Sequence, residues 1–272
     1  MTTEHERVAN PRPAVGVAGL RGCLMILEWQ AVHGIRNWRG ALVGGLVIPL
    51  VTLAAIGFGL GAVVPHGAVG DSSYLRFVAP AVLATAAFQY AVAESTEPVM
   101  AGFKWQRTYE GVAVTPVTPR QMVIGQLLWT AAQIAASGAL VALVMVACDA
   151  MEPLPALLAL VFSTVGALAF AAPVMAFSAM VRDGSAFTAL NRMIILPMTL
   201  VAGTYFPISQ LPTAARGLAM ATPLWHTVEL CRDGGTGGPT SGAIAVHLAV
   251  LALWAAIGLA ATFRLFRRRL TF

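Results

Sequence analysis

Residues 154–181 read LPALLALVFSTVGALAFAAPVMAFSAMV and contain no charged side chain. As an α-helix rising 1.5 Å per residue, this stretch would extend roughly 42 Å, which exceeds the ~30 Å hydrocarbon core of a bilayer. Lipid offers backbone N–H and C=O groups no hydrogen-bond partner, so a segment this apolar must satisfy them internally, as a helix does. The stretch therefore predicts a transmembrane helix.

The composition extends this interpretation to most of the chain. Hydrophobic residues make up 58% of the 272 residues and charged residues only 11%, whereas a water-soluble domain carries about 25% charged residues. So few charges cannot solvate a globular surface, which excludes a soluble protein. Further apolar runs long enough to cross a bilayer lie at residues 41–64, 77–97, 122–147, 187–206 and 243–263. We therefore predict an all-α membrane protein with six transmembrane helices within residues 41–272.

The N-terminal part of the chain differs from these runs. Residues 1–17 are polar, and we expect them to form a flexible cytoplasmic tail. Residues 18–40 mix several leucines with Arg21, Glu28 and Arg36. That pattern is too charged to span a bilayer but apolar enough to lie in the interface as an amphipathic helix. A soluble tail helix is the alternative.

Basic residues are distributed unequally between the two sides of the predicted membrane domain. If the N-terminus is cytoplasmic, three of the 17 lysines and arginines fall outside, namely Arg76, Arg216 and Arg232. The other 14 fall inside: Arg7, Arg12, Arg21, Arg36, Arg39, Lys104, Arg107, Arg120, Arg182, Arg192, Arg264, Arg267, Arg268 and Arg269. By the positive-inside rule, this asymmetry places both termini in the cytoplasm. The C-terminal arginines directly follow a span, so they indicate the anionic inner leaflet rather than nucleic acid.

The inner connection between the second and third spans is unusually long and rich in charges and aromatic rings. It contains Lys104, Trp105, Arg107, Tyr109 and Glu110. Two Thr-Pro pairs at residues 115–116 and 118–119 end one helix and start the next, because proline is tolerated only in the first turn. This connection is predicted to be a docking surface for a soluble partner, and an inert interfacial loop is the alternative.

The outer connection before the last span carries a second group of turn residues. Its apolar middle, residues 213–221, is too short to span a bilayer. The prolines and the histidine that bracket it are Pro207, Pro212, Pro223 and His226. We predict a re-entrant hairpin of two short helices dipping into the outer leaflet, followed by a flexible hinge at residues 233–242. An ordinary outer loop is the alternative.

The chain lacks the residues that bind and hydrolyse ATP. The P-loop pattern GxxxxGK[ST] is absent, and Lys104, the sole lysine, stands in the unrelated context AGFKWQ. No serine or acidic pattern typical of an intramembrane enzyme occurs, and Cys23, Cys148 and Cys231 form no metal-binding spacing. We therefore expect no catalytic, cofactor-binding or metal-binding residue, and any ATP-driven work requires a separate subunit.

A few polar residues within the predicted spans are candidates for lining a transport pathway. They are Glu94, Glu97, Gln126, Gln133 and Arg192. Gln126 and Gln133 are seven residues apart and therefore share a helix face. The alternatives are snorkelling of the charges to the interface and hydrogen bonding between helices. The pattern Gly40-x3-Gly44 is instead typical of close contact between helices.

Two sets of residues resemble a known family of membrane proteins. The first set is Phe103, Arg107-Thr108-Tyr109-Glu110-Gly111, Thr115-Pro116-Val117, Gly125-Gln126 and Trp129. The second set is Phe206-Pro207, Leu211-Pro212, Pro223-Leu224, His226, Glu229-Leu230 and Arg232. Together they resemble the integral membrane subunit of ABC-2 exporters, in the branch with nodulation-factor, polysaccharide and daunorubicin-type drug exporters. Gln126 and Arg120 depart from the family pattern, which commonly has acidic residues there.

The resemblance implies an architecture and a set of partners. It implies six spans, an interfacial helix near residues 20–39 and a coupling helix near residues 101–114 that contacts the ATPase. It further implies two permeases, identical or homologous, paired with two ATPase subunits that bind ATP and magnesium. The apolar spans favour export of a drug-like or lipid-like cargo across the bacterial cytoplasmic membrane. A polysaccharide or glycolipid exporter is the second reading, and an ion-coupled transporter or channel is the rival class.

Overall fold

The computed structural model describes residues 19–36, 39–40, 43–60, 74–181, 183–236 and 241–270. Within these ranges the chain forms helices joined by turns and contains no β-strand, as predicted for an all-α protein. The predicted tail, residues 1–17, lies outside the described residues.

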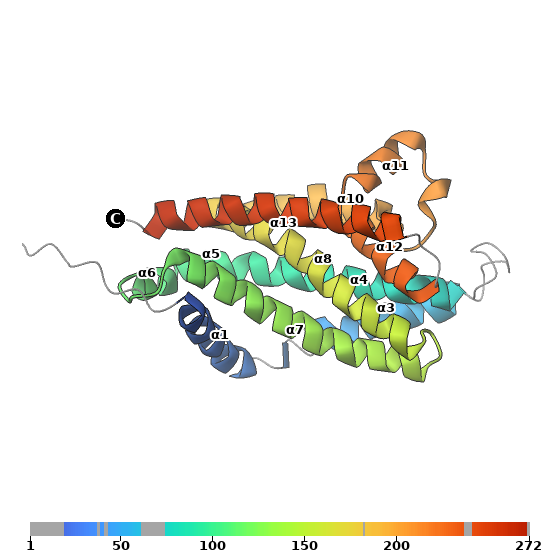
Figure 1. Cartoon of the computed structure of the whole chain (residues 1–272), viewed down its shortest axis with the longest axis horizontal. Helices are drawn as coiled ribbons and strands as arrows, with labels where there is room; N and C mark the ends of the chain where they lie inside the picture. The colour runs from blue at the N-terminus through green and yellow to red at the C-terminus, as the bar shows by residue number, and fades with distance from the viewer. Residues whose placement is uncertain are drawn as a thin grey trace, which may run out of the picture.

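Four helical segments are long and apolar enough to cross a membrane (Figure 1). The first consists of α4 (Tyr74–Ser95) and α5 (Glu97–Lys104), interrupted only at Thr96. The others are α7 (Pro119–Ala147), α8 (Pro153–Met180) and α13 (Ser241–Leu270). These helices coincide with four of the six predicted spans to within a few residues, except that α5 continues beyond residue 97 to Lys104 and α13 continues beyond residue 263 to Leu270.

The other two predicted spans correspond to shorter, irregular apolar segments. One consists of η1 (Val43–Val47), α3 (Ile48–Leu53) and η2 (Ala54–Leu60), and the other of α9 (Ser185–Leu190), η3 (Asn191–Ile195) and α10 (Leu196–Val201). The elements η1, η2 and η3 are π-helices. Pro49 and Pro197 stand in the first turns of α3 and α10, where their missing N–H groups interrupt the regular α-helical ladder. The count of six spans remains a prediction.

Helix α8 lies at the centre of the bundle and packs against α4, α7, α12 and α13. Buried alanines cover much of its surface, which lets neighbouring backbones approach closely. The ring of Phe170 stacks on Phe88 of α4 with centroids 4.4 Å apart. Thr262 of α13 donates a hydrogen bond to the Ala172 carbonyl at 2.7 Å. Small residues and interhelical hydrogen bonds thus hold the long helices together where lipid offers no hydrophobic driving force.

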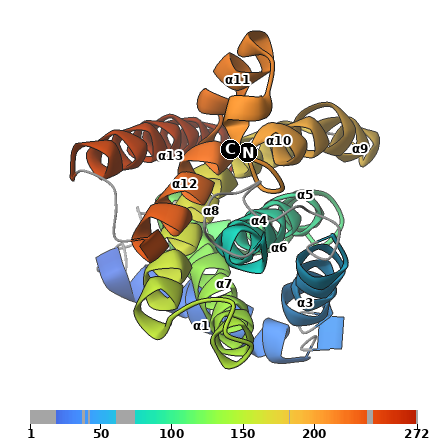
Figure 2. The same cartoon turned by 90° about the vertical axis from the view of Figure 1, so that its right-hand side faces the viewer.

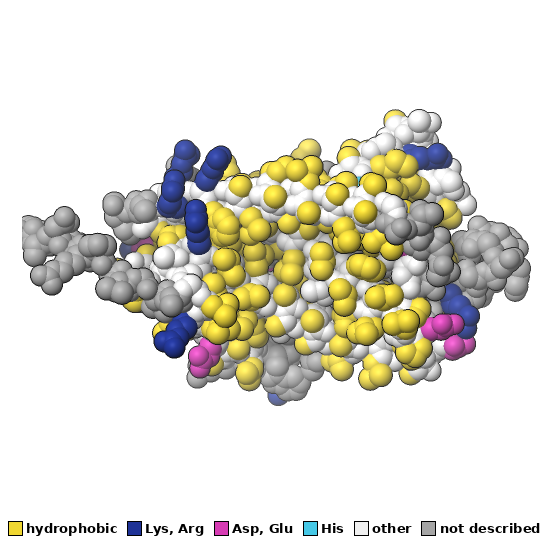
Figure 3. All heavy atoms as spheres, in the orientation of Figure 1, with side chains coloured by type: hydrophobic (Ala, Val, Ile, Leu, Met, Phe, Trp, Pro, Cys, Tyr) yellow, Lys and Arg dark blue, Asp and Glu magenta, His cyan; other side chains and the backbone are white. Residues whose placement is uncertain are grey.

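The two ends of the bundle are polar and the middle is apolar (Figure 3). At one end, basic side chains gather on the last turn of α13, where Arg267, Arg268 and Arg269 are exposed. At the other end, Arg76 at the start of α4 forms a 2.9 Å ion pair with Asp149 in the turn between α7 and α8. The apolar band between the ends is the surface expected of a protein in a bilayer.

Helix α1 (Gly19–Arg36) runs obliquely across α7 at the basic end (Figure 1). It packs through Cys23 and Ile26, which are buried, and leaves Leu20, Met25 and Ile35 exposed. The Gln121 amide of α7 donates a 3.0 Å hydrogen bond to the Gly19 carbonyl. An exposed apolar face on a helix at the bundle's edge fits the predicted interfacial helix, although residues 18 and 37–38 of the predicted range 18–40 lie outside the described residues.

The connection after α10 contains three short helices at the end opposite α1 (Figure 1). They are η4 (Ile208–Gln210), α11 (Thr213–Met220) and α12 (Pro223–Thr236). The predicted pair of short helices is therefore present as α11 and α12. The predicted hinge is partly wrong, because α12 continues through residues 233–236 and only 237–240 lie outside the described residues.

Candidate functional site

A cavity of about 580 Å³ lies between α1, the irregular segment 43–60, α4 and α7. Thr204 and Tyr205, in the loop that follows α10, also line it. Its volume falls in the range of ~300–1,000 Å³ that is typical of small-molecule sites. In Figure 2, α3 lies below α4 and α9–α10 lie above it, and the residues that line the cavity come from the α3 side, with none from segment 185–201.

One face of α4 forms the longest wall of the cavity. Its lining residues recur every three or four positions: Val82, Thr85, Ala86, Gln89, Tyr90, Ala93 and Glu94. Helical spacing places these side chains on one face, and Pro98 continues the wall on α5. From residue 82 to residue 98 the wall extends roughly 24 Å. It therefore covers most of the thickness of a bilayer's hydrocarbon core.

Amide side chains from α7 and α1 form the facing walls. Gln126, Trp129 and Gln133 are one and two turns apart on α7 and line the cavity together. The Gln133 amide donates a 3.0 Å hydrogen bond to the Tyr90 hydroxyl, which joins α7 to α4. The Gln30 side-chain amide of α1 donates a hydrogen bond to Oε1 of the Gln126 side chain. The polar lining is therefore an ordered network between three helices.

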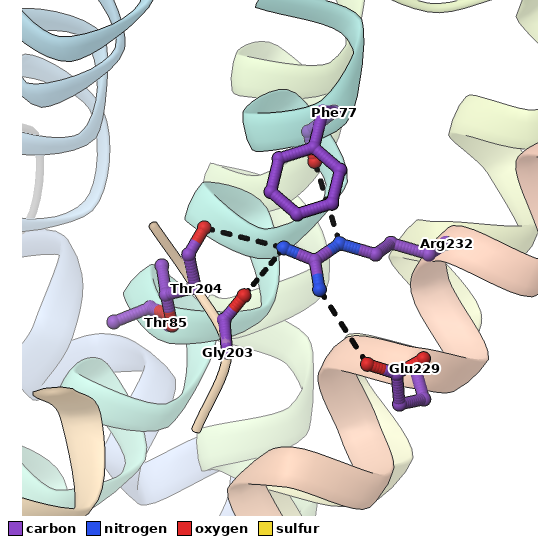
Figure 4. Close-up of polar contacts among 6 residues, drawn as sticks. All are labelled: Phe77, Thr85, Gly203, Thr204, Glu229 and Arg232. Carbon is purple, nitrogen blue, oxygen red and sulfur yellow. Dashed lines mark hydrogen bonds and ion pairs between the residues drawn. The ribbon is translucent and has the colours of Figure 1, made fainter. Parts of the chain in front are cut away.

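Arg232 of α12 holds the loop that bounds the cavity at its other end (Figure 4). Its guanidinium donates to the carbonyl of Gly203 at 2.5 Å and to that of Thr204 at 3.3 Å. It also donates to the Phe77 carbonyl, lies 3.9 Å from the centre of the Phe77 ring, and pairs with Glu229 at 3.5 Å. Removing this side chain would leave several acceptors without their donor.

The loop held by Arg232 reaches the cavity through its next two residues. Gly203 has φ +78°, a left-handed conformation that favours glycine. The Thr204 hydroxyl lies 3.2 Å from that of Thr85 on α4, and the Tyr205 carbonyl accepts a 3.0 Å hydrogen bond from Tyr74. The loop is thus tied to both α4 and α12. We call residues 202–206 the closing loop.

The structure brings together three of the five predicted pathway residues. Glu94, Gln126 and Gln133 line the cavity. Glu97 is exposed in the first turn of α5, and Arg192 is exposed on η3; neither lines it. Gly40 and Gly44 make no close contact with another helix of the described chain, because a Cβ at either position would meet nothing within 4 Å. Both glycines line the cavity instead.

Several lining residues were not identified from the sequence. They are Gln30, Gln89, Tyr90, Trp129 and Tyr205. A usable signal was present on α4, where the polar side chains of Thr85, Gln89 and Glu94 follow the helical period. Gln30 and Tyr205 carried no such signal, because their proximity depends on how distant segments pack.

A second, open cavity of about 1100 Å³ lies at the basic end, between α1, α7 and α13. Arg120, Arg264 and Arg267 line it. Although this groove is larger, it contains none of the predicted pathway residues. Its basic lining contrasts with the first cavity, where no lysine, arginine or histidine stands among the described lining residues.

The predicted docking connection lies at the basic end and is a broken helix rather than a continuous one. Helix α5 ends at Lys104, and α6 (Thr108–Ala113) begins after a turn at residues 105–107. Arg107 has φ 49°, a strained left-handed conformation for a residue other than glycine. Trp105 is 66% exposed and the Arg107 side chain 76%. We call residues 104–107 and Glu110 the inner turn.

Tyr109 does not belong to the exposed surface of the inner turn. Its ring is buried between Phe103 of α5 and Phe266 of α13, with centroid distances of 4.6 and 5.3 Å. Burial raises the pKa of the Tyr109 phenol, which therefore remains neutral at physiological pH. The prediction that Tyr109 contacts a partner is therefore wrong for its ring, which instead anchors α6 against the last helix.

The predicted hairpin residues lie where helices begin or meet at the opposite end. Pro207 and Pro212 precede η4 and α11, and Pro223 opens α12. Nδ1 of His226 lies 2.7 Å from Nδ1 of His247 on α13. Nε2 of His226 lies 2.9 Å from the Met220 carbonyl and must donate to it, so in the neutral pair His247 donates to His226. This pair ties α12 to α13.

These features define a class of protein: a multi-pass helical membrane protein with a polar-lined cavity. Residues 40–264 match the model of a family described as ABC-2 family transporter protein. The chain belongs to this family.

Characterised relatives extend the match along nearly the whole chain. It is 30% identical over 250 residues to Nodulation protein J of Rhizobium leguminosarum bv. viciae, covering 90% of this chain and 95% of that protein. It is 32% identical over 251 residues to Nodulation protein J of Rhizobium leguminosarum bv. trifolii, covering 90% and 94%. The similarity to Nodulation protein J of Bradyrhizobium diazoefficiens is 30% over 249 residues, covering 89% and 94%.

Proposed function

We propose that this chain is the permease subunit of an ATP-driven exporter in the bacterial cytoplasmic membrane. One observation carries the proposal: the cavity and the inner turn belong to the same interrupted helix. The cavity face is on α4 and ends at Pro98 on α5, and α5 ends at the inner turn. A partner that moves the inner turn therefore acts directly on a wall of the cavity.

The charge distribution supports an orientation for this subunit. The inner turn and the arginines of α13 share one end of the bundle, as the 4.8 Å separation of the Phe103 and Phe266 rings requires. We assign that end to the cytoplasm by the positive-inside rule. Both termini are then cytoplasmic, and α11 and α12 form the outer hairpin.

ATP hydrolysis belongs to a separate ABC-type ATPase subunit that binds ATP and magnesium. The contact surface that we propose for it comprises Lys104, Trp105, Arg107 and Glu110, without Tyr109. Exposed aromatic and arginine side chains are enriched at protein interfaces. A second permease, identical or homologous, completes the transporter on the side that carries segments 43–60 and 185–201.

The cargo that we propose is amphipathic, either drug-like or lipid-like. The cavity combines apolar walls from Ile48, Pro49 and Val82 with amide and carboxylate groups, and such mixed linings suit a molecule with a tail and a polar head. A glycolipid or polysaccharide is the second candidate, because amides and the Trp129 ring also suit neutral sugars. Export follows when closure of the ATPase pair displaces the inner turn and rearranges α4 against α3.

Reconstitution with an ABC ATPase of the same genome tests this function. Vesicles containing both proteins should export a fluorescent amphiphile only with ATP. The double substitution Trp105→Ala and Arg107→Ala should reduce ATPase co-purification by about tenfold, whereas Arg216→Ala, at the opposite end, should not. Unchanged ATPase binding would refute the inner-turn surface. Export driven by an ion gradient without ATPase would refute the exporter class in favour of secondary transport.

A further inference from the structure

We infer that the cavity selects amphiphiles with a cationic head group, and that Glu94 is the residue that pairs with the cation. This inference rests on the proposed exporter function and specifies the chemistry of its cargo. The site is the inner half of the cavity, formed by Glu94 and Tyr90 on α4, Gln126 and Trp129 on α7, and Gln30 on α1.

Glu94 is a carboxylate within a membrane-spanning helix without a cationic partner on the described chain. Its side chain lines the cavity, and none of the ion pairs formed by the described residues includes it. A carboxylate within the bilayer is costly unless it is paired, and residues that bear this cost are typically functional. A cationic ligand would supply the missing partner.

The surrounding groups favour a cation and disfavour an anion. Aromatic rings stabilise ammonium groups through their negative faces, and tryptophan does so best. Tyr90 lies one turn from Glu94 on the same helix face, and Trp129 lines the cavity from α7. Arg120, Arg264 and Arg267 line the separate groove at the inner end rather than this cavity. An anionic head would meet a carboxylate here, and no basic side chain is among the described lining residues.

The hydrogen-bond network leaves Glu94 as the principal charged contact. Gln30 and Gln126 bind each other, and Gln133 binds Tyr90. These amides already have partners, two of them each other and the third the Tyr90 hydroxyl, so they position the walls rather than neutralise a charge. The apolar side of the cavity, formed by Ile48, Pro49 and Val82, accepts the tail of the amphiphile.

Binding of matched probes to the full-length chain in lipid nanodiscs tests the inference. The probes share one photoreactive dodecyl tail and carry a trimethylammonium, a glucoside or a sulfate head. On the wild-type chain we expect the trimethylammonium probe to bind about tenfold more tightly than the glucoside, with the sulfate weakest. Glu94→Gln should remove this preference, and Glu94→Asp should retain most of it.

Glu97→Gln is the matched control. It removes the same charge as Glu94→Gln, but Glu97 lies one turn further along the chain and does not line the cavity. It should leave the affinity for every probe within about twofold of the wild type. The inference is overturned if the wild type binds the glucoside as tightly as the trimethylammonium probe, or if Glu94→Gln and Glu97→Gln behave alike. The affinities of the wild-type chain for the three probes test the preference for a cationic head group even if Glu94→Gln does not fold.

Transport measurements separate this inference from the proposed function. If ATP drives export of all three probes equally, cation selection is wrong and the exporter assignment stands. If the trimethylammonium probe binds through Glu94 but ATP and the ATPase never drive its export or that of the other probes, the site is correct and the exporter assignment is wrong.

Discussion

The long helices and the two irregular segments are both apolar, yet they differ in geometry. Helix α8 runs without interruption from Pro153 to Met180 although it contains Pro173. Segments 43–60 and 185–201, which are similar to each other in length, each consist of short α-helical and π-helical parts. Much of α8 is buried by other helices, whereas Ile48, Val51, Met193 and Leu196 are exposed.

The difference shows that tertiary packing, rather than composition, decides how regular each helix is. Pro173 sits where α13 approaches so closely that a Cβ on Gly258 would overlap the proline ring. Neighbours on all sides hold that stretch in helical form. Pro197 is exposed and Pro49 lines the cavity, and their segments keep the π-helical irregularities that often accompany functional sites. The cavity lies where the regular helices meet the irregular segments.

The largest expected effect is a loss of stability when the packing of the long, regular helices is disrupted. We expect Gly258→Leu to destabilise the bundle by more than about 3 kcal/mol, because the new side chain must displace the α8 backbone at Pro173. Thermal unfolding followed by size-exclusion chromatography measures this loss. Gly44→Leu, in the irregular segment, adds the same side chain where nothing lies within 4 Å and should remain folded. Equal stability of the two variants would show that the regular helices are not the scaffold.

The next largest effect concerns the closing loop, which joins the irregular segment 185–201 to the helices that follow it. Arg232→Gln should release the closing loop from α12, because the guanidinium bonds to Gly203 and Thr204 are lost. The cost is about 1–3 kcal/mol for each buried acceptor left unpaired. A cysteine at Thr204 should then react with a thiol reagent about tenfold faster, in a background where the exposed Cys148 is replaced by serine.

Arg216→Gln is the matched control for that substitution. Arg216 also donates to backbone carbonyls, those of Ile208 and Ser209, but its partners lie beyond the closing loop. Reaction at Thr204→Cys should be unchanged in this variant. If both substitutions accelerate the reaction equally, Arg232 does not specifically hold the loop.

A smaller effect follows from making the irregular segments regular. Pro49→Ala restores an N–H group, so η1 and α3 can join as one α-helix. We expect ATP-dependent export to fall by about threefold with no loss of thermal stability. Pro80→Ala in α4 is the control, since this proline lies inside a regular, buried helix. Faster export by the Pro49 variant would contradict a role for the irregularity.

The smallest effect is expected at the anchor below the inner turn. Tyr109→Phe keeps the ring between Phe103 and Phe266 and should change stability by less than about 1 kcal/mol. Tyr109→Ala empties the site and should weaken ATPase binding, although Tyr109 itself is buried. Co-purification of the ATPase with both variants measures the difference, and equal binding would show that α6 needs no anchor.

Hydropathy alone located the four long helices, because lipid leaves an uncharged segment of that length no other way to satisfy its backbone. The start of α7 was also predictable, since Thr118 and Gln121 form the reciprocal cap expected before Pro119. The cavity was only partly predictable: Gln126 and Gln133 share a helix face in any packing, whereas Gln30 joins them only because α1 crosses α7. Tyr109 and Trp105 are both aromatic residues of the same connection, so the sequence does not show which one is buried. Tyr109 is buried because its ring packs against Phe266 of α13, whereas Trp105 is exposed.

The interruption at Thr96 has a mechanical consequence. Thr96 departs from helical geometry, with φ −100° and ψ −97°, and Pro98 has no N–H group to extend the ladder back into α4. The α5 rod can therefore tilt or turn without unwinding the rod that carries Glu94. The joint lies two residues from Glu94 and two from Pro98, which both line the cavity, and one short helix, α5, from the inner turn. If a partner displaces the inner turn, as proposed above, this joint would let α5 shift the cavity wall at Pro98 while α4 keeps its helical form.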